Sequence, residues 1–207
     1  AEEGHNVVLK QVAELPEVNS SEGYVLTVTP DQVLIRATSG AGLFYGVQTM
    51  LQMADEKELP VGVITDEPRF AYRGFMMDVS RHFFNKEFIK KQMDALAYYK
   101  LNRLHLHLTD AAGWRLEIKK YPRLTEFAAW REFPTWKEWW NNGRRYEEEG
   151  SKDAHGGYYT QDDIRELVAY AQERFITVIP EIEMPAHSEE VLTAYPELSC
   201  THEPYKQ

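Results

Sequence analysis

Ionisable side chains follow three short apolar runs of the sequence. The three endings read DVSRH over 78–82, HLHLTD over 105–110 and PEIEMPAH over 180–187. In a sheet of parallel strands joined by helices, ligands bind beyond the carboxyl ends of the strands, because loops and helix N-termini converge there. If these runs are neighbouring strands of one such sheet, we expect their polar endings to form a common site.

The second ending contains two histidines. In a strand, His105 and His107 share one face while the leucines between and beside them share the other, since side chains alternate. We expect Leu104, Leu106 and Leu108 to face the covering helices and the histidines to face inward. Most simply, the two imidazoles are hydrogen-bonded core groups that hold neighbouring strands together.

A metal site is the alternative for the same residues. His105 and His107, followed by Asp110, resemble the first ligands of some barrel metallohydrolases, so a metal-dependent barrel hydrolase is one alternative function. Stoichiometric zinc in the protein would support it. Cys200 is the only cysteine, which excludes an internal disulfide and a zinc site built on thiolates.

The elements that would position these endings alternate between strand and helix. We expect strands over 74–80, 103–109 and 177–183. Such alternation indicates parallel pairing through helical crossovers, and with polar strand endings it predicts an α/β fold that opens a TIM (β/α)8 barrel. Three strands cannot close a barrel, so we expect the remainder to be missing from this chain or supplied by another.

Two helices are expected between these strands. The first begins after Asn85, and its apolar stripe contains Ile89, Met93, Leu96 and Tyr99. The second begins at Thr160, which with Asp163 matches the pattern of a capping box.

The first third of the chain has a different pattern. Alternating runs over 24–28 and 33–37 flank Thr-Pro-Asp-Gln and predict an antiparallel hairpin. A helix over 41–54 and a further strand over 59–64 complete a small α+β unit with an antiparallel sheet.

The expected domain boundary lies near Asp66. Residues 1–66 would form the small α+β domain and residues 67–207 the first part of the barrel, because Asp-Glu-Pro-Arg after residue 65 is typical of a connector. The stretch over 121–159 is longer than an ordinary connection and is rich in Trp, Arg, Glu and Gly. Long excursions of this kind usually serve a site.

The composition limits the class of partner. Acidic residues outnumber basic ones by 33 to 23, giving a net charge of −10 at pH 7, which argues against nucleic acid or an anionic membrane. The sequence has no apolar run of about eighteen residues, so we expect no membrane span, and its polar start does not resemble a signal peptide. An aromatic content of 13% suits a carbohydrate-binding protein, although core aromatics are commoner.

Four blocks of the sequence resemble consecutive motifs of family 20 glycoside hydrolases, the β-N-acetylhexosaminidases. The blocks are RGFMMDVSRHFF, KLNRLHLHLTDAAGWRLEIKKYPRLTE, GGYYTQDDIRELVAYAQERFITVIPEIEMPAHS and AYPELSC. The resemblance extends from about Tyr72 to Cys200, and residues 1–66 resemble the small domain that precedes the barrel in that family.

The resemblance implies that a terminal N-acetylglucosamine or N-acetylgalactosamine is removed from a β-linked glycan with retention of configuration. The nucleophile in this family is the 2-acetamido oxygen of the substrate, which forms an oxazolinium ion. No metal or other cofactor is expected. We expect the parent enzyme to act in a secreted, periplasmic or lysosome-like compartment.

The resemblance also implies roles for three residues. Arg81 would hydrogen-bond the 3- and 4-hydroxyls of the terminal sugar, since a guanidinium presents several fixed donors. Asp110 and His187 would form the pair that orients and tunes the catalytic acid. The alternatives are structural: an ion pair at the barrel rim for Arg81 and ordinary hydrogen bonding for the other two.

Other predicted contacts with the sugar depart from the family pattern or have a packing alternative. Glu183 is a substrate-binding candidate at a position where the family more often has aspartate. Trp114 and Trp130 are candidates for platforms under the leaving group, although buried packing is the default for a tryptophan. Ala111 and Ala112 stand where many members have Asp-Gln or Asn-Gln, so the loop has no polar side chains at these two positions to contact a sugar.

The catalytic acid of the family is not found in this sequence. In the family an adjacent Asp-Glu pair at the end of the fourth strand supplies the acid and the acetamido-orienting residue, whereas here the only such pairs are Asp55-Glu56 and Asp66-Glu67, upstream of the barrel strands. We therefore expect this chain alone to be inactive, as a fragment or as the ordered part of a longer enzyme. A non-catalytic sugar-binding module that keeps Arg81 is the other alternative.

Overall fold

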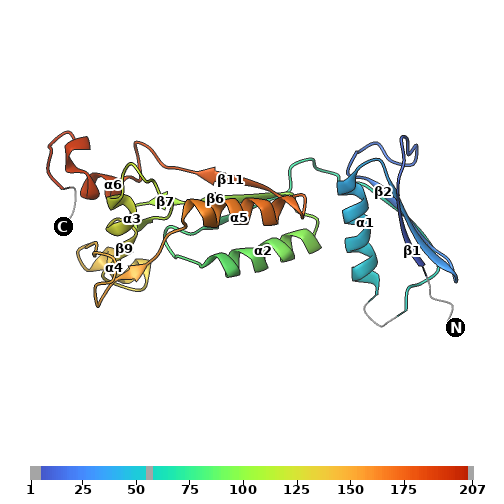
Figure 1. The fold of residues 1–207 in the computed structure, drawn as a ribbon, viewed down its shortest axis with the longest axis horizontal. Helices are drawn as coiled ribbons and strands as arrows, with labels where there is room; N and C mark the ends of the chain where they lie inside the picture. Colours follow the sequence, from blue (N-terminus) through green and yellow to red (C-terminus); the bar gives the residue numbers. More distant parts are fainter. Residues whose placement is uncertain (1–5, 55–57, 205–207) are drawn as a thin grey trace. The chain divides into compact units, whose positions relative to one another are not determined.

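The computed structural model describes residues 6–54 and 58–204, which form two compact units (Figure 1). The first unit comprises Ala1–Arg73 together with Ala95–Asn102, and the second comprises Gly74–Asp94 together with Arg103–Gln207. The pair Asp55-Glu56 lies outside the described residues.

The first unit contains a four-stranded sheet in the order β1-β3-β2-β4. The strands are β1 (Asn6–Gln11), β2 (Tyr24–Val28), β3 (Gln32–Ala37) and β4 (Gly62–Asp66). Strand β2 pairs antiparallel with both β3 and β4, so the predicted hairpin is confirmed. The predicted third strand is present but lies slightly later in the chain, and β1, which pairs parallel with β3, was not predicted.

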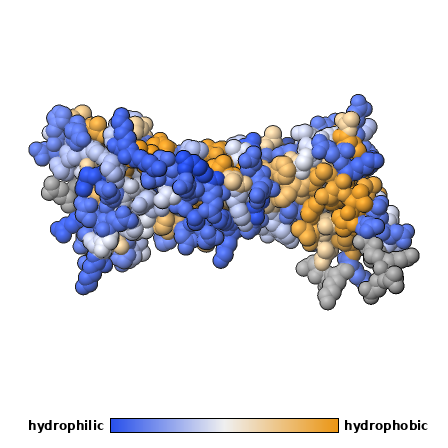
Figure 2. Space-filling model, viewed as in Figure 1, coloured by the Kyte–Doolittle hydropathy of each residue, from blue (hydrophilic) through white to orange (hydrophobic). Residues whose placement is uncertain are grey.

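Helix α1 (Gly40–Met53) packs on this sheet. Ser39 caps it, with its Oγ accepting a hydrogen bond of 3.1 Å from the Gly42 N–H. Helix and sheet approach so closely that a Cβ on Gly46 would lie 2.5 Å from Cγ2 of Ile35, so glycine is needed there. Figure 2 shows hydrophobic residues on the viewed face of α1.

The second unit is built on a parallel sheet in the order β11-β6-β5. Strands β5 (Gly74–Asp78), β6 (Arg103–His107) and β11 (Thr177–Glu181) confirm the three predicted strands and their parallel pairing. Their register places Asp78, His107 and Glu181 opposite one another at the carboxyl ends. Polar groups that are far apart in the sequence are thereby brought into one row.

Two helices lie side by side over this sheet, α2 (Lys86–Tyr98) and α5 (Gln161–Gln172) (Figure 1). Lys86 on α2 contacts Asp163 on α5 at 2.7 Å. Leu104, Leu106 and Leu108 are all buried, as expected for the face beneath the helices.

Both predicted helix starts are confirmed. The Asn85 side chain accepts a hydrogen bond of 2.9 Å from the Phe88 N–H, and Thr160 forms the complete capping box with Asp163. Ile89, Met93 and Leu96 are buried as predicted. The prediction for Tyr99 was wrong: α2 ends at Tyr98, and Tyr99 is 70% exposed.

Shorter elements gather beyond the carboxyl ends of the parallel strands (Figure 1). They are β7 (Thr109–Asp110), β8 (Gly113–Trp114), α3 (Arg123–Glu126), β9 (Trp130–Arg131), α4 (Trp136–Asn141), β10 (His155–Gly156), α6 (Glu189–Ala194) and the 3-10 helix η1 (Pro196–Leu198). The long excursion over 121–159 thus contains structure of its own. Within the described ranges, no helix has the length and apolar character needed to cross a membrane.

Candidate active site

Two histidines connect strands β6 and β11. Nε2 of His105 lies 2.6 Å from Oε2 of Glu181, and Nδ1 of His107 lies 2.9 Å from the same oxygen. One carboxylate on the neighbouring strand therefore binds both imidazoles, which is the strand-holding arrangement considered above.

Asp110 lies at the centre of a charged network just beyond β6. Its carboxylate is buried, and Oδ2 lies 2.6 Å from Nη2 of Arg81 and 3.0 Å from Nε2 of His107. Nδ1 of His187 lies 3.2 Å from the same Oδ2, and the Ala111 N–H donates a hydrogen bond of 2.7 Å to Oδ1. Both oxygens of this buried group thus have partners, as burial of a charged group requires.

Arg81 is held by the strand that precedes it. Oδ1 of Asp78 accepts hydrogen bonds from the backbone N–H groups of Ser80 and Arg81, and Oδ2 accepts one of 2.8 Å from Nη1 of Arg81. The Asp78 carboxylate therefore fixes the turn after β5 and aims the guanidinium at Asp110.

His187 reaches Asp110 from the loop after β11. The loop is held by Ser188, whose hydroxyl donates to the carbonyl oxygens of Glu183 and Ala186. The imidazole of His187 is half exposed, so one edge can face a ligand while Nδ1 faces Asp110.

Arg81, Asp110 and His187 line one cavity of about 480 Å³. Helices α4 and α6 and the turn between β7 and β8 provide further lining residues. The structure therefore brings together the three residues to which the family resemblance assigns roles.

The pKa values of the ionisable groups at the ends of β6 and β11 are shifted in different directions. Burial alone lowers the pKa of His107, but hydrogen bonds to Glu181 and Asp110 outweigh it, and the pKa is raised. The hydrogen bond to His107 is the main cause that lowers the pKa of Glu181 to about 2. The pKa of Glu183 is raised, first by its hydrogen bond to the Glu181 carboxylate and then by burial. The pKa values of Glu181 and Glu183 are therefore shifted in opposite directions.

Glu183 lies beside the cavity and not in its wall. Its backbone N–H donates to Oγ1 of Thr109 at 2.8 Å. Ligand atoms of His107, Glu181 and Glu183 lie within 4.8 Å of one another, a spacing that a metal ion could use. This group shares only His107 with the alternative metal set of the sequence analysis, His105, His107 and Asp110. In the structure Asp110 is bound to Arg81.

Trp114 does not line the cavity, contrary to its predicted contact with the sugar. It is 4% exposed, its indole N–H donates to the Leu116 carbonyl, and it packs against Leu124 and Ala128. Its ring is therefore part of the packing beneath the site. Trp130 is similarly tied to the backbone, donating a hydrogen bond of 2.8 Å to the Thr125 carbonyl.

The cavity instead contains two tryptophans that sequence reasoning missed, Trp136 and Trp140 on α4. Their spacing of four residues after Thr135, a good helix cap, was the available signal.

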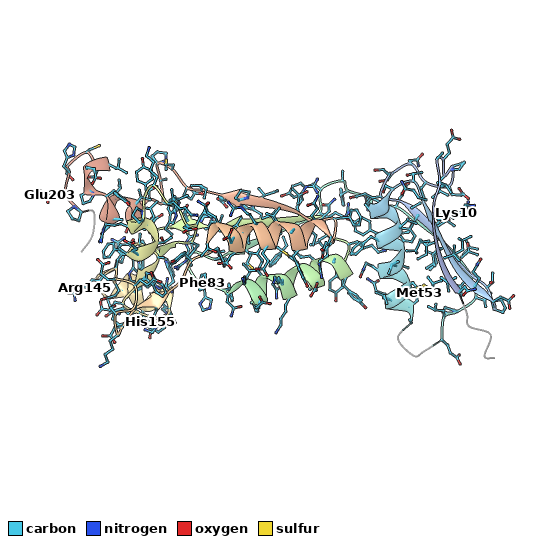
Figure 3. The ribbon with its side chains drawn as sticks, in the orientation of Figure 1. Lys10, Met53, Phe83, Arg145, His155 and Glu203 are labelled. Atoms are coloured by element: carbon cyan, nitrogen blue, oxygen red, sulfur yellow. The ribbon has the colours of Figure 1, made fainter. Side chains whose placement is uncertain are left out.

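A third missed residue is Arg115, which is fully buried beneath the site. Its guanidinium donates hydrogen bonds to five carbonyl oxygens, those of Val79, Ser80, Ala112, Ala129 and Gly157. Burial lowers the pKa of Arg115 to about 9. Figure 3 shows Phe83, Arg145 and His155 at this loop-bearing end of the second unit, and the Phe83 ring lies 5.7 Å from the Arg115 guanidinium carbon. One side chain thus ties together the loops that surround the cavity.

Two family models match the chain. Residues 70–207 match the catalytic domain of glycosyl hydrolase family 20, and residues 1–67 match domain 2 of that family. The chain belongs to glycosyl hydrolase family 20.

Relatives of this family 20 chain include a beta-hexosaminidase from Porphyromonas gingivalis, which is 46% identical over 196 residues covering 89% of the chain and 23% of the relative. Among solved structures, a beta-N-acetylhexosaminidase from Bacteroides fragilis is 36% identical with a TM-score of 0.78, over 96% of this chain and 38% of that one. An exo beta-N-acetylglucosaminidase from Vibrio harveyi in complex with N-acetylglucosamine is 35% identical with a TM-score of 0.78, over 97% and 32%. The chain therefore spans a minor part of each relative.

The likeness to family 20 structures shows an α/β fold of TIM-barrel type. In the described part of the chain the sheets are separate and no barrel is closed.

The Asp66-Glu67 pair of this family 20 chain is bound within the first unit. Oδ2 of Asp66 accepts hydrogen bonds of 2.6 Å from the Tyr24 hydroxyl and 2.9 Å from the Lys100 ammonium group. Glu67 accepts bonds from the backbone N–H groups of Asn19 and Ser20. These contacts give both carboxylates a structural role.

Proposed function

We propose that the protein containing this chain is an exo-β-N-acetylhexosaminidase that removes terminal N-acetylglucosamine or N-acetylgalactosamine from β-linked glycans. The supporting observation is the meeting of Arg81, Asp110 and His187 at one cavity beyond the parallel strands. Family membership and the names of the relatives support the same activity.

The proposed reaction is substrate-assisted, as the family resemblance implies. The acetamido oxygen of the terminal sugar attacks C1 while an acid protonates the glycosidic oxygen, so the C1–O bond breaks and the leaving sugar departs. Water then adds to C1 of the oxazolinium ion, the ring opens, and the β-configuration is restored.

In this proposal Arg81 holds the hydroxyls of the terminal sugar. A guanidinium has five N–H donors, and its contacts with the carboxylates of Asp78 and Asp110 use two of them among the described residues. Asp110 and His187 act as positioning residues: Asp110 fixes the imidazole, and the other ring nitrogen of His187 is available to hold the acid.

The acid and the acetamido-orienting residue would come from residues other than these 207. After Arg73 the sequence has no adjacent Asp-Glu pair. We propose that residues 1–66 form a small α+β domain and that residues 67–207 form the first part of a (β/α)8 barrel, in which β5, β6 and β11 are three of the eight strands. The exposure of Phe75 and Met76 on β5 supports this, since a closed barrel would cover apolar side chains of that strand.

The test is hydrolysis of 4-nitrophenyl N-acetyl-β-glucosaminide by the full-length protein, with the anomer of the released sugar followed by NMR. We expect turnover with the β-anomer formed first. First appearance of the α-anomer would contradict the substrate-assisted mechanism. Sugar binding without turnover would favour the non-catalytic module, and turnover that requires stoichiometric zinc would favour the metal-dependent hydrolase.

A further inference from the structure

We propose that Glu181 and His107 are positioning residues of the candidate active site, which act on His187 through the Asp110 carboxylate. This inference rests on the proposed function and deepens it, because it extends the groups that hold the catalytic acid from the cavity wall to strand β11. From the sequence, His107 was expected either to hold neighbouring strands together or to bind a metal.

The four residues form a continuous chain of contacts. Oε2 of Glu181 lies 2.9 Å from Nδ1 of His107, and Nε2 of the same ring lies 3.0 Å from Oδ2 of Asp110. That carboxylate oxygen lies 3.2 Å from Nδ1 of His187. The chain of contacts therefore begins on β11, passes through the last residue of β6 and ends at an imidazole that lines the cavity.

The middle of this chain is buried, whereas its end is exposed. The side chains of His107 and Asp110 are 8% and 4% exposed, and the pairing of β11 with β6 places Glu181 directly opposite His107. Packing keeps such side chains in one arrangement, and their hydrogen bonds are stronger than they would be in water. The side chain of His187 is 55% exposed, so its orientation depends on the buried carboxylate that it contacts.

Each ring nitrogen of His107 faces a carboxylate oxygen. Only the imidazolium form donates a hydrogen bond from both nitrogens. Burial lowers the pKa of this ring, but the hydrogen bonds to Glu181 and Asp110 outweigh burial and raise it. Asp78 is a third carboxylate near the ring, and Arg81 is a cation 2.9 Å from Nε2. A charged His107 therefore supplies a second cation to a group that contains three carboxylates.

A neutral His107 is the alternative, in which Nε2 accepts a hydrogen bond from Nη1 of Arg81. That nitrogen already has an acceptor, because Oδ2 of Asp78 lies 2.8 Å from it. A neutral ring that donates from Nδ1 to Glu181 would also direct the lone pair of Nε2 at the Asp110 carboxylate, and the two would repel. The two forms differ in their consequence, since a charged ring supports Asp110 and a neutral ring supports Arg81.

The charged form explains how a residue below the cavity affects the reaction. The imidazolium and the Arg81 guanidinium both contact Oδ2 of Asp110, which holds this carboxylate in one orientation. The carboxylate in turn accepts the Nδ1–H of His187 and directs the other ring nitrogen towards the acid of the proposed reaction. Loss of the imidazolium leaves the contacts of Arg81 with Asp78 and Asp110 in place, so it should affect proton transfer and not sugar binding.

The experiment compares the two histidines of β6 in the full-length protein. His105 and His107 contact the same oxygen of Glu181, but of the two, in the described part of the chain, His107 alone also contacts Asp110. We expect His107→Gln to lower kcat for N,N′-diacetylchitobiose by about tenfold, because its leaving sugar needs a proton. The matched control His105→Gln should change this kcat less than about twofold.

Two further measurements distinguish a positioning role from a structural one. His107→Gln should lower kcat for 4-nitrophenyl N-acetyl-β-glucosaminide less than for chitobiose, since 4-nitrophenolate departs without a proton. It should change the inhibition constant of N-acetylglucosamine less than about twofold. If His107→Gln does not fold, Glu181→Gln replaces it, because this variant keeps an acceptor for Nδ1 and removes the charge; the same pattern is expected.

Three kinetic results would overturn the inference: equal losses of kcat with both substrates, equal losses in the two histidine variants, or weaker binding of N-acetylglucosamine with kcat unchanged. The charge of His107 is tested separately by NMR of the unmodified protein with histidine-selective 15N labelling. We expect two ring N–H signals from His107 at pH 7, and a single signal would contradict the charged form. If the unmodified protein hydrolyses neither substrate, the proposed function fails, and these signals alone decide whether the chain of contacts exists.

Discussion

Asp110 is the residue on which the site depends most. Among the residues that the structure describes, it is the one carboxylate that Arg81, His107 and His187 share, so its loss would release a sugar-binding group and a positioning group together. The sequence placed it at the end of a strand, and the structure adds the connection to His107, which lies three residues earlier in the same segment.

We therefore expect Asp110→Asn to lower kcat of the full-length enzyme by at least about tenfold. This is a part of the roughly 10²- to 10⁴-fold rate increase that a general acid supplies. Loss of the carboxylate would release the imidazole of His187, so the pH dependence of kcat should also shift. Asp162→Asn, at an exposed position on α5, is the matched control and should change neither quantity. An unchanged pH profile with reduced kcat would assign Asp110 a purely structural role.

Glu190 is a buried acid on α6 beside the site. It is fully buried, and neither carboxylate oxygen has a hydrogen-bond partner among the described residues. Burial raises its pKa to about 8. Below pH 4.5 both folded and unfolded states are protonated at this position, whereas between pH 4.5 and 8 only the unfolded state ionises, so the contribution of Glu190 to stability falls as the pH rises.

Replacing Glu190 by Gln removes this loss of stability with rising pH, because Gln does not ionise. We expect the variant to be roughly 2–3 kcal/mol more stable than the unmodified chain at pH 7, with the difference disappearing near pH 4.5. Urea unfolding at the two pH values measures it, with Glu197→Gln at an exposed position as control. A stability gain that is the same at both pH values would contradict a role of ionisation.

At the scale of the elements, Arg115 connects loops that differ widely in sequence position. Its five carbonyl partners lie after β5, between β7 and β8 and within the long excursion. Arg115→Lys should destabilise the fold by about 3 kcal/mol or more, because an ammonium group has only three donors and a buried charge would lose partners. Thermal unfolding measures this, and Arg165→Lys, an exposed residue of α5, should have almost no effect. A small change in Tm for Arg115→Lys would contradict this prediction and would mean that water replaces the lost hydrogen bonds.

Elements with strong local signals were predictable, and those set by distant contacts were not. The capping residues Asn85 and Thr160 and the three parallel strands follow from local chemistry and alternation. Arg115 was missed because its partners are backbone carbonyls, which have no sequence signature. Helix α4 was missed because six residues are too few for a periodic pattern.

The same distinction holds for the candidate site. Arg81, Asp110 and His187 could be named because the family resemblance assigns roles to them, and each also follows a strand that the sequence pattern predicted. Trp114 was placed wrongly because a buried and an exposed tryptophan look alike in a sequence, and only packing against Leu124 and Ala128 distinguishes them.

At the scale of the whole molecule, we expect sugar binding and bond cleavage to depend on different parts of the protein. The 207 residues contain the proposed sugar-binding and positioning groups, while no adjacent Asp-Glu pair follows β5. We expect a polypeptide restricted to residues 1–207 to hydrolyse 4-nitrophenyl N-acetyl-β-glucosaminide at least about 10²- to 10⁴-fold more slowly than the full-length enzyme. Intact-mass measurement confirms the sample, and strong turnover by a verified 207-residue chain would disprove the assignment of the acid.

We expect Arg81, Asp110 and His187 to surround the terminal sugar. A crystal structure of the full-length protein with N-acetylglucosamine bound tests it most directly. We expect the sugar in the cavity beyond β5, β6 and β11, with the Arg81 guanidinium within hydrogen-bond distance of the 3- and 4-hydroxyls and the Asp110–His187 contact intact. A sugar bound elsewhere, or an Arg81 that contacts only Asp78 and Asp110 while the sugar is bound, would contradict it.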